Sequence, residues 1–332
     1  MFKKMSDLGK AGMFTVLVLI IASVMGLVFH VRAEVYMFSP LIAVVIMLIV
    51  TGDAFTKKGW KELGIHKAGF SKWRFAICIP LIVLTTGYIL FWLTPYASIV
   101  KPEDFDGAPL WFVLIKLLVV FVLYTITSAL GEEIGWRGYL LLKLQSVGTK
   151  NALWLSGFIH AIFHFPIIFA GIYLTEGNPF IIVPLFVVMT MFGGVFFGYV
   201  RITTGSVWPA TIMHSVHNVY FNLILEQSTH SESNVAQYLG GESGIIVVGL
   251  YGIVCLWILK KGNKLSDREI DVLYYLSKGL TNKAIAESLF LSVGTIKNYI
   301  SIIYSKLNVE NRALAAKMAV LENLVPIKKQ DR

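Results

Sequence analysis

Long apolar runs separated by short polar segments dominate the hydrophobic pattern of this chain. Eight such runs cover residues 13–31, 36–50, 75–93, 110–142, 151–173, 180–200, 207–225 and 245–259. Each run is close to or above the length that an α-helix needs to cross the hydrocarbon core of a bilayer. The pattern therefore predicts an all-α protein, a polytopic transmembrane helical bundle of about eight spans.

Composition and charge support this prediction and add an orientation. Hydrophobic residues make up 56% of the 332 residues, and charged residues only 15%. Both cysteines, Cys78 and Cys255, lie in apolar runs, which excludes a disulfide framework or a cysteine metal cluster. Lys and Arg concentrate at the termini and in alternate loops, and such loops face the cytoplasm. We therefore expect a multi-pass protein of the cell membrane, embedded in the lipid bilayer, with cytoplasmic N- and C-termini.

Charged residues interrupt the fourth apolar run at residues 131–138, which read Gly-Glu-Glu-Ile-Gly-Trp-Arg-Gly. Charge inside a membrane span is energetically expensive, and for that reason it indicates a functional site. Glu133 and Arg137 stand four residues apart with the acid first, the order that favours an ion pair on a helix. Glu132 is turned about 100° away from Glu133 on the same helix, which frees it to face another partner.

Two later apolar runs contain polar residues one helical turn apart. His160 and His164 share a face of the fifth run, and His214 and Asn218 share a face of the seventh. At 1.5 Å per residue, Glu132 and His164 lie about 20 Å, and His214 about 14 Å, from the expected cytoplasmic helix ends. Three helices are therefore expected to bring an acid, two imidazoles and an amide to one buried level.

The order of these motifs resembles the CAAX protease and bacteriocin-processing family, also called Abi proteins, which are relatives of the Ras-converting endopeptidase. The resemblance covers about residues 60–225 and implies an intramembrane endopeptidase over residues 1–259, with its motif core at 110–225. It implies catalytic roles for Glu132, His164, His214 and Asn218, and a supporting role for Glu133 and Arg137. The second motif of the family usually has an aromatic where this chain has His160. We expect His160 to fill that space, although it could also join the site.

Residue chemistry supplies a mechanism that matches the resemblance. A positioned carboxylate can act as general base toward a water molecule. We expect Glu132, helped by His164, to activate the water, and His214 and Asn218 to stabilise the oxyanion. The competing chemistry is a zinc ion held by Glu132, His164 and His214. We favour the mechanism without a cofactor, and zinc remains the alternative.

The composition changes abruptly after residue 259. Residues 260–332 carry 13 Lys and Arg against 7 Asp and Glu, a net charge of +6, which is compatible with DNA. Capping residues predict four short helices, which begin after Ser266, Thr281, Ser292 and Asn311. Ser266 and Glu269 form the pattern of a capping box. A tight connection at 291–294 predicts a helix-turn-helix, with a linker at 260–264, the domain at 265–325 and a tail at 326–332.

The third of these helices has an apolar stripe and a polar face. Ile296, Ile300 and Ile303 form the stripe, which we expect to be buried. The residues expected to bind DNA in the major groove are Thr295, Lys297, Asn298 and Ser301. Residues 265–320 closely resemble the LuxR-type helix-turn-helix, with two departures, Ala284 for the usual glutamate and Tyr299 for the usual histidine.

The whole sequence predicts an intramembrane endopeptidase fused to a cytoplasmic DNA-binding transcription regulator. The expected partners are a peptide or protein substrate, lipidated or not, double-stranded DNA, and a second copy through the C-terminal domain. The alternative is a membrane-anchored LuxR-type regulator whose peptidase-like pocket senses a ligand without catalysis. A third interpretation is an immunity-type membrane protein whose fused domain binds a protein instead of DNA.

Overall fold

The structure, a computed structural model, is almost entirely helical, which confirms the all-α prediction. It describes residues 5–102, 105, 107–175, 177–231, 235–262, 265–307, 309–322 and 324–325, without the side chains of Lys261, Asn298 and Ser305. The tail expected at 326–332 lies outside the described residues. The chain divides into two units, Met1–Cys255 and Leu256–Arg332. The division falls inside α14 (Ile245–Gly262), four residues before the expected domain end at residue 259.

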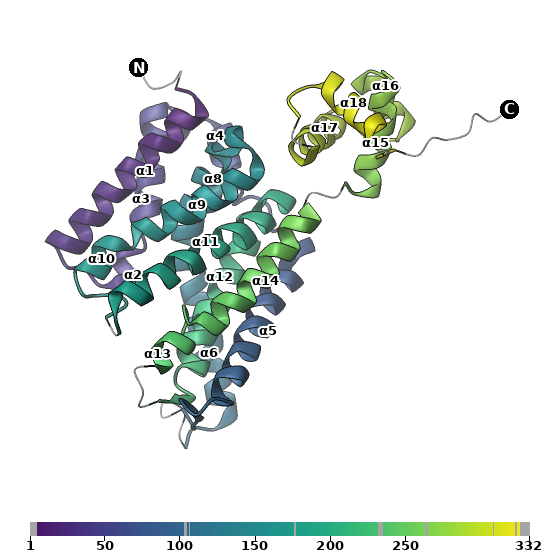
Figure 1. The fold of residues 1–332 in the computed structure, drawn as a ribbon. Helices are drawn as coiled ribbons and strands as arrows, with labels where there is room; N and C mark the ends of the chain where they lie inside the picture. The colour runs from purple at the N-terminus through teal and green to yellow at the C-terminus, as the bar shows by residue number, and fades with distance from the viewer. Residues whose placement is uncertain are drawn as a thin grey trace. The chain divides into compact units, whose positions relative to one another are not determined.

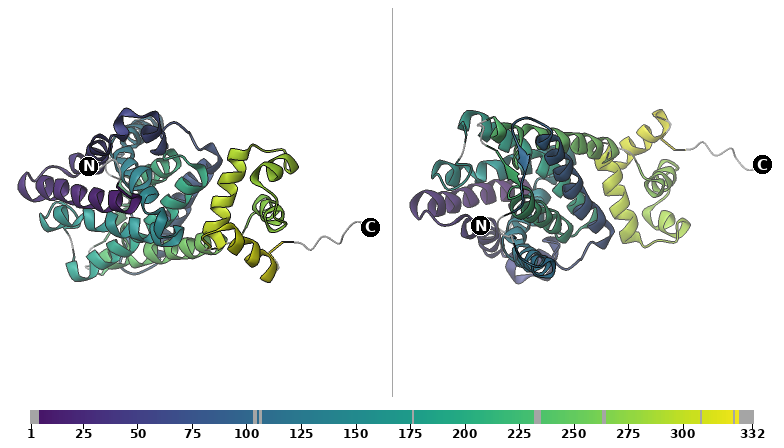
Figure 2. Two further views of the ribbon diagram at one scale, coloured as in Figure 1. Left: turned by 90° about the horizontal axis from the view of Figure 1, so that it is seen from above. Right: turned by 90° about the horizontal axis from the view of Figure 1, so that it is seen from below.

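The first unit is a bundle of long helices that run side by side (Figure 1), and both views of Figure 2 show them gathered together. Its helices before the motif helix are α1 (Asp7–Ser23), α2 (Ala33–Tyr36), α3 (Ser39–Thr51), α4 (Lys57–Glu62) and α5 (Trp73–Trp92). The motif helix comprises α6 (Leu110–Tyr124), α7 (Leu130–Glu133) and α8 (Leu141–Lys143), joined by π-helical segments. Then follow α9 (Thr149–Phe163), α10 (Phe165–Phe169), α11 (Pro179–Thr204), α12 (Trp208–Tyr220), α13 (Ala236–Leu239) and α14.

Shorter elements complete this unit. The π-helical segments are Val24–Val28, Thr125–Ala129, Ile134–Leu140 and Phe221–Leu225. Single 3₁₀ turns occur at Asp53–Phe55, Phe70–Lys72 and Gln145–Val147. The strands β1 (Ser98–Ile99) and β2 (Thr229–His230) pair antiparallel, with Ser98 opposite His230.

Six helical stretches of the described chain are long and apolar enough to cross a membrane. They are Asp7–Val28, Ala33–Thr51, Phe70–Trp92, Leu110–Lys143, Thr149–Phe169 and Pro179–Thr204. The two remaining runs of the sequence prediction, 207–225 and 245–259, also form helices, namely α12 with its π-helical extension and α14. His214, His217 and Asn218 make α12 more polar than the helices of membrane length, which follows from its place in the site.

Close backbone contact holds α9 against α11. A Cβ atom added at Gly194 would lie 2.6 Å from Cα of Gly157, and one added at Gly157 would lie 2.7 Å from Cα of Met191. Such distances require glycine on both helices. Small residues that let helix backbones approach are the usual basis of helix packing in membranes, where lipid tails are as apolar as the side chains.

Polar contacts tie segments together at each end of the bundle. At one end, Nζ of Lys143 lies 3.1 Å from Glu62 and 3.2 Å from Asp7, and Lys10 pairs with Asp53 at 2.9 Å. At the other end, the pairing of β1 with β2 joins the loops after α5 and α12. The sequence assigns the first group to one side of the membrane and the two loops to the other, and these contacts agree with that grouping.

The second unit contains α15 (Asp267–Ser277), α16 (Asn282–Ser288), α17 (Val293–Leu307) and α18 (Arg312–Leu321). All four predicted caps are present: Ser266, Thr281, Ser292 and Asn311 accept from backbone amides three residues ahead, and Ser266 and Glu269 form the capping box. The predicted stripe of Ile296, Ile300 and Ile303 lies in the core. This small helical core is therefore encoded locally, by caps and helical periodicity.

The α9–α11 contact generates a stability prediction. We expect Gly194→Ala to lower the free energy of unfolding by about 1–3 kcal/mol, because the new methyl would overlap the backbone of Gly157. The matched control is Gly249→Ala, where a Cβ would meet nothing within 4 Å. Thermal unfolding of the purified chains would measure both, and equal melting temperatures would contradict the close approach.

The grouping of loops generates a topology prediction. Because positive charge marks the cytoplasmic side, we expect a cysteine at Ser71 to be inside and one at Ser98 to be outside. Both positions are exposed, and both substitutions would be made with Cys78 and Cys255 replaced by alanine. An impermeant thiol reagent should label Ser98→Cys in intact cells and Ser71→Cys only after permeabilisation. Labelling of both in intact cells would refute the orientation.

Candidate active site

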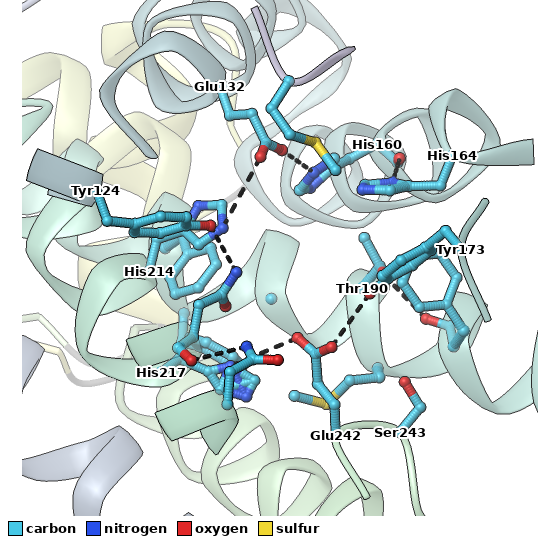
Figure 3. Close-up of a pocket in the computed structure, with 18 residues that line it drawn as sticks. Tyr124, Glu132, His160, His164, Tyr173, Thr190, His214, His217, Glu242 and Ser243 are labelled. Carbon is cyan, nitrogen blue, oxygen red and sulfur yellow. Dashed lines mark hydrogen bonds and ion pairs between the residues drawn. The ribbon is translucent and has the colours of Figure 1, made fainter. Parts of the chain in front are cut away.

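A cavity of about 150 Å³ lies inside the first unit. Its lining comes from α6, α7, α9, α11 and α12 and from the segments that carry Tyr173 and Glu242. Glu132, His160, His164, His214 and Asn218 all lie on this lining. The structure therefore brings together the polar residues of the three sequence motifs (Figure 3).

The helix that carries the two glutamates is wound differently from an ordinary α-helix. The π-helical segment Thr125–Ala129 precedes α7, and Ile134–Leu140 follows it. Such wider turns within α-helices occur frequently at functional sites. Gly135 lets the second segment lie against α3, since a Cβ there would be 2.4 Å from Cβ of Pro40. The winding and the close contact together fix the direction of the glutamates.

The Glu133–Arg137 ion pair predicted from the sequence is present in the interior. Nη1 of Arg137 donates to Oε1 of Glu133 at 2.9 Å, and neither side chain has exposed surface. The same oxygen accepts a hydrogen bond from Nδ1 of His214, 3.0 Å away. The Arg137 guanidinium also lies over the ring of Phe197, 4.8 Å from its centroid. Oε1 of Glu133 is thus occupied by two donors from the protein, whereas its Oε2 is buried without a hydrogen-bond partner among the described residues.

Glu132, in contrast, faces the cavity. Its Oε2 accepts a hydrogen bond from Nε2 of His160 at 2.9 Å, and its Oε1 lies 4.0 Å from Nε2 of His214. Figure 3 shows its carboxylate directed between these two imidazoles. The two adjacent glutamates therefore have different surroundings: one is bound within the protein, and the other is presented to the cavity.

His160 does more than the space-filling role expected from the sequence. Its ring packs on Trp136 with centroids 4.8 Å apart, as an aromatic side chain would. Its Nε2 also hydrogen-bonds to Glu132, which a phenyl ring cannot do. His160 therefore fills the space of the aromatic and also contacts Glu132, because an imidazole of similar size offers two polar nitrogens.

The hydrogen bond of His164 assigns its tautomer. Nδ1 of His164 lies 3.0 Å from the backbone carbonyl of His160. A carbonyl oxygen only accepts, so Nδ1 carries the proton, and Nε2 of a neutral ring keeps its lone pair. That lone pair can accept a proton from water or bind a metal ion. The same geometry places His164 beside Glu132 on the cavity lining.

The amide of Asn218 is held by a residue that sequence analysis did not single out. Nδ2 of Asn218 donates to the hydroxyl of Tyr124 at 2.7 Å, so α12 is joined to α6 at the cavity. Tyr173 and Glu242 also line the cavity and were not predicted. Tyr124 and Tyr173 look like ordinary apolar-run residues in the sequence, and Glu242 looks like one of several acids in a loop. Only their spatial convergence reveals them.

Three possible metal ligands lie close together in the cavity, and one of them differs from the set expected from the sequence. The ligand atoms of Glu132, His160 and His164 lie within 4.8 Å of one another. The zinc alternative from the sequence had His214 in place of His160. Nδ1 of His214 bonds Glu133, and its Nε2 lies 4.0 Å from Oε1 of Glu132 on the cavity lining, so His214 remains a possible ligand as well. A carboxylate and two imidazoles suit zinc. To bind it, Nε2 of His160 would have to exchange its hydrogen bond to Glu132 for the metal.

The second unit presents part of the predicted DNA-binding face. Lys297 and Ser301 are exposed on α17, and the side chain of Asn298 lies outside the described residues. The hydroxyl of Thr295 is half-buried and lies 2.8 Å from the hydroxyl of Ser292, so it belongs to the cap of α17. Lys297 and Ser301 therefore remain exposed on the face of α17 opposite the isoleucine stripe.

Several individual proteins are similar in sequence to the second unit of this chain. LnrK, a transcriptional regulatory protein of Bacillus subtilis, is 51% identical over 61 residues, 18% of this chain and 28% of LnrK. The DNA-binding transcriptional activator DevR/DosR of Mycobacterium tuberculosis is 49% identical over 55 residues, 17% of this chain and 25% of the relative. LiaR of Bacillus subtilis is 43% identical over 61 residues, which are 18% of this chain and 29% of LiaR. The chain thus spans less than a third of these relatives.

Two segments match known protein families. Residues 114–220 match the family described as Type II CAAX prenyl endopeptidase Rce1-like, and residues 263–319 match the bacterial regulatory proteins of the luxR family. The first match contains Glu132, His160, His164, His214 and Asn218, and it ends before Glu242. The chain is therefore a multi-pass membrane protein that joins an Rce1-like segment to a luxR-type helix-turn-helix domain.

Proposed function

We propose that this protein is an intramembrane endopeptidase that hydrolyses peptide bonds with a glutamate-activated water. The observation that carries the proposal is the different placement of two adjacent glutamates. Glu133 is occupied by Arg137 and His214, whereas Glu132 faces a cavity lined with imidazoles. A general base must reach the proton that it abstracts, and Glu132 is the carboxylate that can reach a cavity water.

The cavity residues have complementary roles in the proposed reaction. Glu132 takes a proton from water, and the resulting hydroxide attacks the peptide carbonyl carbon. The tetrahedral oxyanion then accepts hydrogen bonds from Nε2–H of a protonated His214 and from Nδ2 of Asn218. The carbon–nitrogen bond breaks as the proton on Glu132 passes to the leaving amine. His160 holds Glu132 through its 2.9 Å hydrogen bond, and His164 orients the water.

Zinc chemistry is the second candidate, because one observation favours it. Glu132, His160 and His164 offer three ligand atoms in one small volume, and Nε2 of His164 has a lone pair. A zinc ion held there would lower the pKa of a bound water. The two mechanisms differ in what they require of His160, which zinc needs as a ligand and the glutamate mechanism needs only as a support.

We propose that the second unit binds double-stranded DNA and ties the peptidase to transcription. The support is the luxR-family match over residues 263–319 and the similarity to relatives such as the DNA-binding transcriptional activator DevR/DosR. The exposed Lys297 and Ser301 lie on the third helix, which enters the major groove in helix-turn-helix proteins. Pairing of two such units on a symmetric site would make the protein a homodimer on DNA.

A regulator whose pocket binds a ligand without cleaving it is the alternative function. The cavity would serve as a sensor, and the luxR-type unit would give the response. This alternative requires no general base. The behaviour of Glu132 variants therefore separates the two functions, since a sensor could keep its ligand response after loss of the carboxylate's proton-accepting capacity.

Glu132→Gln tests the peptidase. Glutamine keeps the size and hydrogen bonding of glutamate but takes up no proton at neutral pH. We expect at least about a hundredfold loss of cleavage, the scale of general-base catalysis, with unchanged abundance in the membrane. The measurement is a comparison of membrane-derived peptides from cells with wild type and with the variant. Identical peptide profiles would favour the sensor.

Glu133→Gln is the matched comparison on the same helix. It leaves the buried guanidinium of Arg137 without its carboxylate, which can cost about 3–5 kcal/mol of stability. We expect low abundance and a lowered melting temperature, in contrast to Glu132→Gln. Equal stability of the two variants would show that the two glutamates do not have the separate roles proposed.

His160→Phe, combined with chelation, separates the two mechanisms. Phenylalanine keeps the packing on Trp136 but cannot bind a metal. With the glutamate mechanism, the variant should stay active and a strong zinc chelator should leave the wild-type rate unchanged. With zinc, both the substitution and the chelator should abolish cleavage. The assay follows the peptides that depend on Glu132.

Lys297→Ala tests the DNA-binding surface. If the lysine contacts a base, the full chain in detergent should bind its selected DNA site about 1–3 kcal/mol more weakly. If it contacts only phosphate, the loss should be uniform across sequences and the salt dependence shallower. Lys317→Ala, an exposed lysine on α18, is the control with the same charge change. Equal binding by both variants would show that α17 does not read the DNA.

A further inference from the structure

A second polar cluster lines the cavity opposite Glu132. Figure 3 shows Glu242 and Ser243 on one side of the cavity and Glu132 on the other, with His217 beside Glu242. Glu242 and Ser243 belong to the segment between α13 and α14, and His217 belongs to α12. The Rce1-like match ends at residue 220, so the two loop residues lie outside it. The proposed hydrolysis uses none of the three.

The carboxylate of Glu242 is only partly satisfied by the protein. Its Oε2 accepts a hydrogen bond from the hydroxyl of Tyr173 at 3.1 Å. Its Oε1 lies 4.0 Å from Nδ1 of His217, which is too far for a direct hydrogen bond. The side chain remains 24% accessible, and Glu242 lines the cavity. One carboxylate oxygen is therefore available to a molecule in the cavity.

Two neighbouring polar atoms also lack partners. Among the described residues, Nε2 of His217 and Oγ of Ser243 are buried without a hydrogen-bond partner. His217 is only 5% exposed and Ser243 only 9%, and both residues line the cavity. Buried polar groups are nearly always hydrogen-bonded in folded proteins, and an exception calls for a missing partner. The cluster is therefore complete only when something polar occupies it.

The charged residues of the cavity indicate whether that occupant is a cation or an anion. The described lining residues include two glutamates and neither lysine nor arginine. Burial raises the pKa of the Glu242 carboxyl and so favours its neutral form, an effect that the Tyr173 hydrogen bond and nearby His214 oppose only in part. A bound cation would stabilise the ionised form. An anion would meet two carboxylates, whereas a cation would pair with Glu242. The aromatic rings of Tyr173 and Phe186, 5.7 Å apart, give an apolar wall for the stem of such a group.

We propose that Glu242, Ser243 and His217 form a subsite that binds the ammonium or guanidinium group of a substrate. The N–H groups of the cation donate to Oε1 of Glu242, to Oγ of Ser243 and to the lone pair of a neutral His217. In the proposed peptidase, this subsite selects peptides that carry a basic side chain or a free amino terminus near the scissile bond. The selection of substrates rests on the proposed function, but binding of the cation does not require cleavage.

The test uses the purified full chain in lipid nanodiscs with two small probes. Benzylammonium carries the expected charge, and benzyl alcohol is a neutral molecule of similar shape. A cavity of about 150 Å³ can hold a benzene ring. Saturation-transfer NMR titrations would give the dissociation constants. We expect benzylammonium to bind wild type about tenfold or more tightly than benzyl alcohol, as a charge-assisted contact implies.

Three substitutions locate the binding. Glu242→Gln should remove the preference for benzylammonium. Glu226→Gln should keep it, because Glu226 is likewise bound to a tyrosine hydroxyl, that of Tyr88 at 3.0 Å, but does not line the cavity. Glu132→Gln should also keep it, although the variant is expected to be inactive. If the protein proves not to be a peptidase, the preference for benzylammonium is therefore still expected, and the two proposals can fail separately.

Each other outcome overturns the proposal. It fails if wild type shows no preference for benzylammonium, if Glu242→Gln retains the preference, or if Glu132→Gln alone removes it. Ser243→Ala covers the case in which Glu242→Gln does not fold. It removes one unpartnered acceptor and leaves Glu242 in place, so benzylammonium should bind a few-fold more weakly and benzyl alcohol equally well. Unchanged affinity for both probes would also refute the subsite.

Discussion

The buried contact between Arg137 and Glu133 is the interaction on which the rest of the site depends. Burying two charges carries a large desolvation penalty that their attraction offsets only with good geometry and further hydrogen bonds. Here Glu133 gains a second donor from His214, and Arg137 lies over Phe197. The pair therefore connects the motif helix to α12 and α11 in one network, and it determines which glutamate is left for the cavity.

A second arginine extends this network to the end of the bundle. Nε of Arg201 donates to the backbone carbonyl of Arg137 at 3.0 Å, and Nη2 donates to the carbonyl of Glu62 at 2.6 Å. The backbone amide of Val207 donates to the carbonyl of Gly64, 3.2 Å away. The end of α4 is thus bonded to α11, and the segment after α4 is bonded to the start of α12. These contacts place His214 at a defined depth relative to Glu132.

The cavity is consequently asymmetric in its chemistry. On the Glu132 side, imidazoles and an amide supply hydrogen bonds suited to water activation and oxyanion stabilisation. On the Glu242 side, the available groups are acceptors, and the described lining residues include neither lysine nor arginine. One side can carry out chemistry on a peptide bond while the other holds a charged group of the same molecule. Tyr173 connects them, since its ring lies 5.6 Å from that of His164 and its hydroxyl bonds Glu242.

The sequence by itself determined the features that depend on local spacing. The caps at Ser266 and Thr281 and the stripe of Ile296, Ile300 and Ile303 follow from helical periodicity and backbone hydrogen bonding within a few residues. The Glu133–Arg137 pair also follows from spacing, because its partners are one turn apart. Apolar run length likewise predicted the helical bundle, although α12 proved more polar than a typical span.

Only the tertiary structure decided the features that depend on distant segments. The π-helical winding around α7 and the close contact of Gly135 with Pro40 arise from packing between helices, for which the sequence of one helix carries no periodic signal. The same holds for the hydrogen bond of His160 to Glu132, the bond of Tyr124 to Asn218 and the placement of Glu242 in the cavity. A side chain's spacing predicts the helix face that it occupies. Its partner is fixed by which other helix packs there, and that is a property of the whole bundle.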